Sequence, residues 1–291
     1  MDFETRLISM YVFVTDAYKD SLWIHSERMS NNTIPKFSDE EVITIYLFGI
    51  LEGHYQVSKM YKHTKSYLNK YFPDLPSYQA FNKRLNNLAS TFPYLFEYLD
   101  KRKSPQNLGY IGLLDSMPIV LAKGVRGCKA KVASEIANCS YCASKKMYYY
   151  GVKLHVIGEK VKKSLPYFRY TEITPASEHD SLLLKRMNHI NFENLFADRA
   201  YTGHELYSTV KVNTDTKLIT PIKKKKGQLR LNSRDRMYST AVSKIRQPIE
   251  SLFNWIQEKT NIQNASKVRS LKGLNVHIWG KLTVAMWIMI F

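Results

Sequence analysis

Acidic side chains are scarce in this sequence. The 291 residues include 25 aspartates and glutamates against 43 lysines and arginines, which gives a formal net charge of +18 at pH 7. An excess of this size favours a polyanionic partner, either a nucleic acid or an anionic membrane surface, over a merely soluble basic protein.

Cysteine is also scarce. Cys128, Cys139 and Cys142 are the three cysteines. They are too few for a disulfide framework, and they favour a reducing, cytoplasmic setting. Cys139 and Cys142 form a lone C-x-x-C pair with no second pair at zinc-finger spacing. We therefore expect small residues of a polar loop there, not a zinc or redox site.

Long apolar runs are missing as well. The C-terminal stretch KLTVAMWIMIF is about half as long as the ~20 residues that a spanning helix needs. The N-terminal stretch MDFETRLISMYVF begins with acids, unlike the basic start of a secretory signal peptide. We expect a buried terminal helix and no membrane partner, which leaves nucleic acid as the favoured partner.

Residues 1–103 predict an all-helical domain. The segment SDEEVITIYLFGILEG opens with Ser38 and carries Glu41 three residues later, a capping-box pattern followed by apolar residues at helical spacing. A second helix is predicted in SYQAFNKRLNNLASTF, where Lys83 and Arg84 are on the polar side and can bind DNA. A helix-turn-helix and a plain helical bundle both remain open for this region.

Residues 104–291 predict an α/β domain. The segments YIGLLDSMPIVLA, YYYGVKLHVIGE and SLPYFRYTEITPA predict three consecutive strands. NLFADRAYTG and TKLITPIK predict two more, which alternate with helices. This order indicates a mixed sheet flanked by helices, preceded by the helical N-terminal domain.

Three acids stand out because each projects from a rigid element near a core, where an unpaired carboxylate is costly. Asp115 and Asp198 follow predicted strands, and Glu250 is beside the apolar stripe of a predicted helix. Ion pairing with Arg246 accounts for Glu250, but Asp115 has no cation near it in sequence. Arg199 is expected to face away from Asp198, because successive strand side chains point to opposite faces. Mg²⁺ or Mn²⁺, which prefers oxygen ligands, is the alternative partner for all three carboxylates.

From about Tyr110 to the C-terminus the chain resembles bacterial insertion-sequence transposases of the DDE type, which have an RNase H-like catalytic core. The blocks that carry the resemblance are LLDSMPIVLA, YYYGVKLHVI, TPASEHD, LFADRAYTG, IRQPIESLFNWI and NASKVRSLKGL. The resemblance implies that Asp115, Asp198 and Glu250 are the catalytic residues and the ligands of two Mg²⁺ or Mn²⁺ ions. It also implies metal-dependent cleavage of DNA at the ends of an insertion sequence, followed by strand transfer.

Some relatives carry a Tyr–Arg–Glu–Lys signature around the glutamate. Here Arg246 matches the arginine, but Ser243 stands at the tyrosine position and Gln257 at the lysine position. This departure leaves open a transposase-derived DNA-binding protein without catalysis. A nuclease with the same core, which would cut without strand transfer, is the other alternative.

The expected partners are double-stranded DNA, as terminal inverted repeats and target DNA, and a second copy of the chain on that DNA. The expected location is the cytoplasm, in association with the nucleoid. The residues predicted to bind DNA are Arg246, Lys153, His155, Lys223, Lys224, Lys225, Lys226, Lys83 and Arg84.

Overall fold

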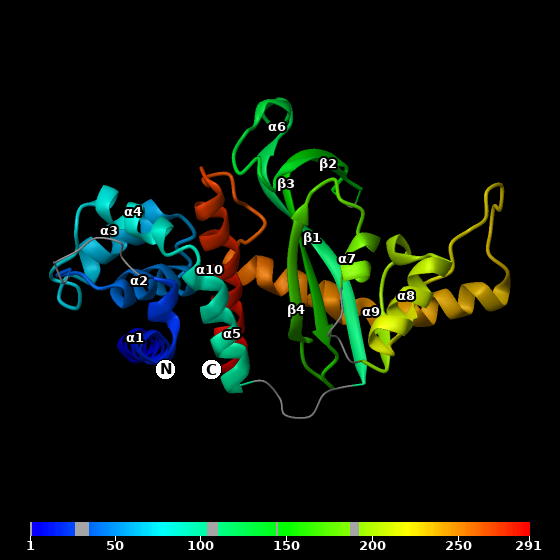
Figure 1. The fold of residues 1–291 in the computed structure, drawn as a ribbon, viewed down its shortest axis with the longest axis horizontal. Coiled ribbons are helices and arrows are strands. Elements are labelled where there is room, and N and C mark those ends of the chain that lie inside the picture. The colour runs from blue at the N-terminus through cyan, green and yellow to red at the C-terminus, as the bar shows by residue number, and fades with distance from the viewer. Residues whose placement is uncertain (1, 27–34, 104–109, 144, 187–191) are drawn as a thin grey trace. The chain divides into compact units, whose positions relative to one another are not determined.

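The computed structural model describes residues 2–26, 35–103, 110–143, 145–186 and 192–291 (Figure 1). The chain forms two compact units. Unit 1 comprises Met1–Ser104, Val132–Glu135 and Ile256–Phe291, and unit 2 comprises Pro105–Lys131 and Ile136–Trp255. Residues 256–291 thus pack with the N-terminal helices, whereas the sequence prediction placed them with the strand-containing domain.

Unit 1 is helical, as predicted for residues 1–103. The predicted capping box is present at the start of the second helix, where Ser38 Oγ accepts from the Glu41 amide and Glu41 accepts from the Ser38 amide. Its helices are α1 (Phe3–Asp20), η1 (Leu22–His25), α2 (Asp39–Leu51), α3 (Val57–Tyr67), α4 (Tyr78–Asn87), α5 (Thr91–Lys103) and α10 (Leu271–Ile290).

The C-terminal helix α10 explains why the chain end joins unit 1. Apolar residues surround most of its circumference, and it packs on α2, α4 and α5. A helix that is apolar all round must be buried, and these helices cover it. None of the described helices combines the length and the apolarity that crossing a membrane requires.

Unit 2 contains a six-stranded mixed sheet with the strand path β2-β3-β1-β5-β6. Off this path, β4 pairs with β3 on the same edge as β2, away from β1. Pairs β1–β3, β2–β3 and β3–β4 are antiparallel, and pairs β1–β5 and β5–β6 are parallel. The strands are β1 (Ile111–Lys123), β2 (Asn138–Cys142), β3 (Met147–Glu159), β4 (Tyr167–Pro175), β5 (Asn194–Phe196) and β6 (Lys217–Ile219). The helices are α6 (Val125–Lys129), α7 (Ser181–Arg186), η2 (Arg199–Tyr201), α8 (His204–Thr214) and α9 (Ser233–Thr260).

The predicted α/β fold with a helix-flanked mixed sheet is confirmed, and so are the five predicted strands. The strand β2 differs from the prediction, because the segment with Cys139 and Cys142 was expected to be a polar loop. It is an edge strand that pairs only with β3, and its residues are half-buried or exposed. An edge strand with no apolar face carries no local pattern from which pairing can be predicted.

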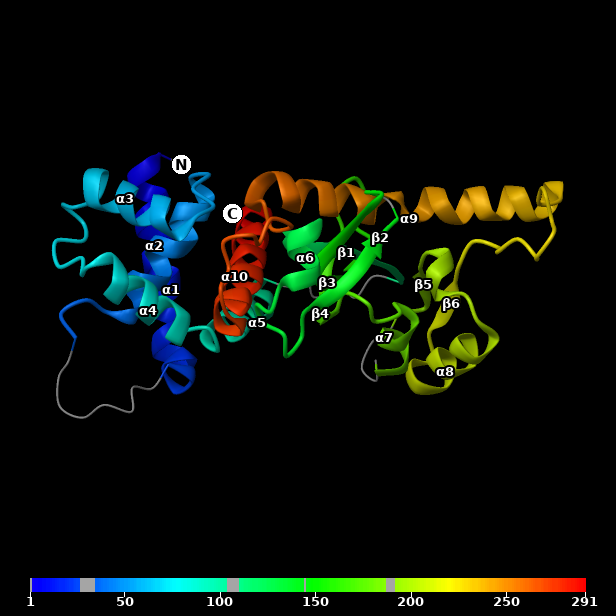
Figure 2. The same cartoon turned by 90° about the horizontal axis from the view of Figure 1, so that it is seen from above.

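Helices cover both faces of the sheet. Leu114 on β1 belongs to a buried apolar cluster that also contains Leu183 of α7 and Leu206 of α8. The opposite face packs on α9, where Ile249 approaches Gly158 of β3 so closely that a side chain there would contact it. Figure 2 shows α9 along one side of the strands and α7 and α8 on the other. Pro248 lies inside α9, which continues on both sides of it.

Candidate active site

Two of the three candidate carboxylates are brought together by strand register. In the parallel pair β1–β5, Leu113 lies opposite Phe196. Asp115 and Asp198 each follow two residues later, and the backbone of Asp198 is still extended. Residues two apart on a strand share a face, so both carboxylates lie at the same level on the face that α9 covers.

The third carboxylate comes from α9, and one guanidinium joins all three. Arg246 Nη1 is 2.8 Å from Asp115 Oδ2, and Arg246 Nη2 is 2.9 Å from Glu250 Oε1 and 3.8 Å from Asp198 Oδ1. Arg246 and Glu250 are one helical turn apart, which places their side chains on one face of α9. The structure therefore brings together four residues from three elements that are far apart in sequence.

The three acids differ in exposure. The Asp115 side chain is 22% exposed, while Asp198 is 49% and Glu250 57% exposed. Burial raises the pKa of Asp115 to about 6, although the nearby Arg246 and the amide of Ser116, which donates to Asp115 Oδ1 at 2.8 Å, both act to lower it. Asp115 is thus the inner carboxylate of the site, and the other two face the solvent.

Arg246 is the most buried member of the group, at 11% exposure. Its Nε is buried and has no hydrogen-bond partner within the part of the chain that the structure describes. The sequence interpretation that Asp115 lacks a near cation is corrected here, because Arg246 approaches it from a position 131 residues away. Among the described residues no ion pair joins Arg199 to Asp198, and Arg199 begins η2 instead of continuing the strand.

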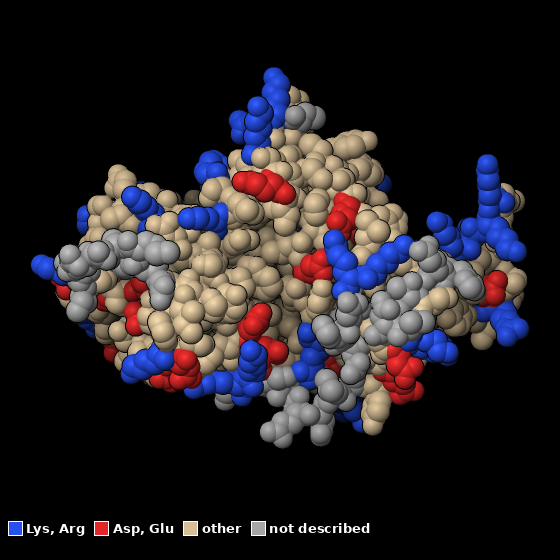
Figure 3. Space-filling model, viewed as in Figure 1, with Lys and Arg blue, Asp and Glu red and all other residues tan. Residues whose placement is uncertain are grey.

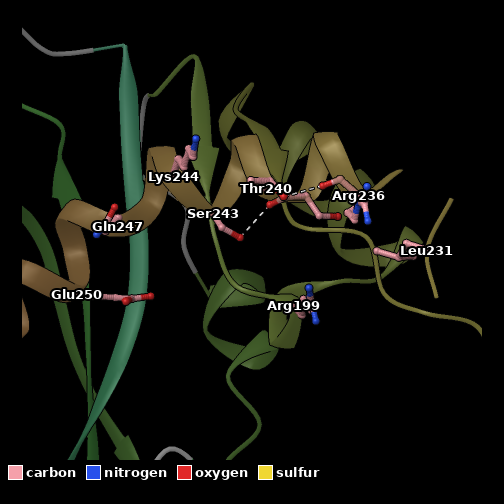
Figure 4. A pocket seen from close by; sticks show the side chains of 9 residues that line it. Arg199, Leu231, Arg236, Thr240, Ser243, Lys244, Gln247 and Glu250 are labelled. Carbon is pink, nitrogen blue, oxygen red and sulfur yellow. Dashed lines mark hydrogen bonds between the residues drawn. The ribbon is translucent and has the colours of Figure 1, made fainter. Parts of the chain in front are cut away.

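A groove adjoins Glu250 and extends along the first half of α9. It has a volume of about 420 Å³, and Glu250 is its single acidic lining residue within the described chain. Arg199 reaches it from η2, while Arg236 and Lys244 lie along α9 (Figure 4). The complete lining is Arg199, Leu231, Arg236, Ser239, Thr240, Ser243, Lys244, Gln247 and Glu250. The groove therefore places three cationic side chains beside one carboxylate.

Lys153 and His155 lie on the other face of the sheet, in a polar network. Lys153 Nζ is 2.7 Å from Asp180 Oδ1 and donates to the carbonyl of Glu178 at 2.8 Å. His155 is 1% exposed, and its Nε2 lies 2.9 Å from Thr174 Oγ1. Burial lowers the pKa of His155 to about 4, so the ring is neutral at pH 7. The predicted DNA contact of His155 is not supported, because a buried ring does not reach a duplex.

Asp180 was not singled out in the sequence, although it belongs to the block TPASEHD. Its Oδ2 accepts from Ser116 Oγ at 3.4 Å, directly beside Asp115 in β1. Tyr201 Oη lies 3.5 Å from His155 Nδ1 in the same network. The network therefore supports the strand that carries Asp115 from behind.

Of the remaining residues predicted to bind DNA, the lysines are exposed, whereas Arg84 is already engaged in an ion pair. Lys223, Lys224, Lys225 and Lys226 are all exposed in the connection between β6 and α9. Figure 3 shows lysine and arginine side chains gathered over that connection and over α6. In unit 1, Lys83 is exposed. Arg84 instead forms a mostly buried ion pair with Asp39 and donates to the carbonyl of Ser26.

The carboxylates fit a hard divalent cation by donor type, since Mg²⁺ and Mn²⁺ prefer oxygen ligands. Their present spacing is set by the guanidinium of Arg246 between them. Across the described ranges, no three histidine, cysteine, aspartate or glutamate side chains already surround a common ion position.

A family model for the transposase DDE domain matches residues 106–271. The chain belongs to the transposase DDE domain family. No curated protein and no solved structure matches it. The matched segment of this DDE transposase contains Asp115, Asp198, Arg246 and Glu250, and it runs from just before β1 to the first residue of α10.

Proposed function

We propose that this transposase cleaves phosphodiester bonds at the ends of an insertion sequence and joins those ends to target DNA. The observation that supports this function best is the convergence of Asp115, Asp198 and Glu250 on one guanidinium. Three carboxylates from separate rigid elements, in a protein with a net charge of +18, suit chemistry on a polyanion.

The three carboxylates are the proposed ligands of Mg²⁺ or Mn²⁺. Two such ions, when bound, activate the attacking water or 3′-hydroxyl and stabilise the leaving oxygen of the phosphodiester. Asp115, held by the Ser116 amide and by β1, is the fixed inner ligand. Asp198 and Glu250 are more exposed and complete the ligand set from the solvent side.

Arg246 positions these acids. Through its contacts with Asp115 and Glu250 it offsets their negative charge and holds Glu250 near the strand ends. Its second proposed role is contact with a phosphate of DNA bound in the adjoining groove, which Glu250 lines. Without its charge, three carboxylates would repel one another and the buried Asp115 would favour its protonated form.

The basic groove along α9 is the proposed path for the DNA strand. Arg199, Arg236 and Lys244 line it, and the exposed Lys223–Lys226 run lies in the connection that leads into α9. Lys153 is proposed as a further DNA contact, once its ion pair with Asp180 opens. We also propose that two copies of the chain hold two DNA ends, an expectation that rests on the family alone.

The test is an excision and integration assay in cells, with a reporter flanked by the inverted repeats found beside the gene. Asp198→Asn should abolish both reactions, because an amide does not replace a carboxylate as a ligand for a hard cation. The matched control is Asp215→Asn, the same change at an exposed residue that caps α8 with a left-handed backbone that asparagine tolerates. Wild-type excision by a folded Asp198→Asn protein would refute the role of the acids.

The same assay separates the two alternatives. Metal-dependent cutting without joining of 3′-ends would identify a nuclease. DNA binding without any metal-dependent cutting would identify a transposase-derived DNA-binding protein.

A further inference from the structure

Unit 1 contains a groove that the catalytic chemistry does not use. It encloses about 700 Å³ and is formed by residues from both ends of the chain. Residues 53–59, at the start of α3, line one part, and residues 264–270, before α10, line another. The second segment is the main part of the block NASKVRSLKGL, for which the candidate active site offers no role.

The charge of this groove is entirely positive. Lys59, Lys267 and Arg269 line it, and no aspartate or glutamate does so within the described chain. None of the three has a carboxylate partner among the residues that the structure describes. Arg269 donates only to the nearby carbonyls of Ser266 and Val268, both at 2.9 Å, so its charge is not neutralised. Three exposed cations without a carboxylate partner in one concave surface give it a positive charge that is complementary to an anionic partner.

Amide side chains accompany these cations. Asn82 and Asn86 of α4 and Asn264 line the groove, and Asn86 Nδ2 donates to the carbonyl of Asn82 at 2.7 Å. Lysine, arginine and amide side chains are the groups that contact DNA phosphates and base edges. Asn82 and Asn86 are on α4, the helix that carries the exposed Lys83.

The C-terminal side of the groove is held in place by several polar contacts. His277 Nε2 lies 2.7 Å from the carbonyl of Ile262, and Lys281 Nζ donates to the carbonyl of Asn261 at 3.1 Å. Ser270 caps α10 by accepting from the Gly273 amide at 3.1 Å. The segment therefore presents its cations from a fixed loop, which lowers the entropy lost on binding.

We propose that this groove binds the phosphate backbone of DNA, with Lys59, Lys267 and Arg269 as the phosphate contacts. The C-terminal segment 264–270 then belongs to the same DNA-binding surface as α3 and α4. This inference rests on the proposed function, because it takes the DNA of the transposition reaction as the partner. It extends the DNA-binding region beyond residues 1–103.

The experiment measures binding of the full chain to a fluorescein-labelled DNA duplex of arbitrary sequence by anisotropy, over a range of salt concentrations. The test variant is Lys267→Gln with Arg269→Gln, since glutamine removes the charge and keeps a hydrogen-bond donor. The matched control is Lys272→Gln with Lys101→Gln, which removes the same two charges from exposed residues that do not line the groove.

The test variant should bind roughly tenfold more weakly near 0.1 M salt, and the slope of log K against log salt should become shallower by about 1.8, since each phosphate contact contributes about 0.9. The control should change the DNA affinity and the salt slope only as far as the lower net charge of the chain changes them. Thermal unfolding followed by circular dichroism, with both variants unchanged from the wild type, excludes a folding defect.

The possible failures are distinguishable. If the folded test variant binds DNA with wild-type affinity and salt slope, the proposed role of the groove in DNA binding is refuted and the proposed function remains intact. A wild-type chain that binds no duplex at all would overturn both.

Discussion

The guanidinium of Arg246 is expected to keep Asp115 ionised near neutral pH, and Arg246→Gln tests this. In the wild type, burial raises the pKa of Asp115 from 3.8 to about 6. Between these pH values the folded protein retains a proton that the unfolded chain has released. The stability that this proton confers is complete below about pH 4 and is lost as pH rises through 6. The difference between the folded and unfolded pKa values of Asp115 corresponds to about 3 kcal/mol of stability.

Removing the guanidinium should raise the pKa of Asp115 further. Arg246 Nη1 and Asp115 Oδ2 are 2.8 Å apart. The charge centres are therefore about 4 Å apart, which at an effective dielectric constant of about 20 is worth about 4 kcal/mol. The Asp115 side chain is 22% exposed, so solvent screening reduces this figure to about 2 kcal/mol. Glu250 is more than half exposed and adds little.

Urea unfolding at about pH 5 and about pH 8, with divalent cations chelated, measures this difference. Arg246→Gln should cost about 2 kcal/mol more at the higher pH, because Asp115 is protonated in both proteins at the lower one. The pH dependence should vanish in an Asp115→Asn background. The control Arg236→Gln, on the same helix but without a carboxylate partner among the described residues, should show no such dependence. An equal cost of Arg246→Gln at both pH values would refute the reasoning.

Two further predictions concern unit 1. Arg84→Gln should lower the free energy of unfolding by about 3 kcal/mol, because it removes the arginine of a buried ion pair and leaves Asp39 with neutral donors such as Tyr18 Oη. Lys83→Gln, at an exposed site on the same helix, should change it by less than about 0.5 kcal/mol. Equal losses in urea unfolding would contradict this assignment. Lys281→Met should stabilise the protein most below pH 7, since burial lowers the pKa of Lys281 to about 7 and the wild type gains stability as pH rises from there. Urea unfolding of the wild type and Lys281→Met across pH measures this effect. A stability difference between the two proteins that does not depend on pH would contradict the prediction.

Most secondary-structure elements could be predicted because their signals are local. The capping box of α2 needs only Ser38 and Glu41, and β1 and β3 carry enough apolar residues to be recognised from sequence. The strand β2 carries no such pattern, because it exists through pairing with β3. The packing of α10 with the N-terminal helices is equally non-local.

The candidate site shows the same division. Asp115, Asp198 and Glu250 could be selected from the sequence, because an acid next to an apolar segment is conspicuous and the family resemblance assigns their roles. The burial of His155 could not be predicted, since alternation along β3 gives the face of a side chain but not what covers it.

The sequence by itself determined the fold class and the three candidate acids and predicted a polyanionic partner, because periodicity, net charge and residue type are properties of short segments and of composition. Only the tertiary structure decided that Arg246 joins the three acids, that Arg84 is committed to Asp39, and that residues 264–270 share a groove with α3 and α4. These pairings link residues far apart in the chain. Their energies depend on distance and burial, which exist only once the chain has folded.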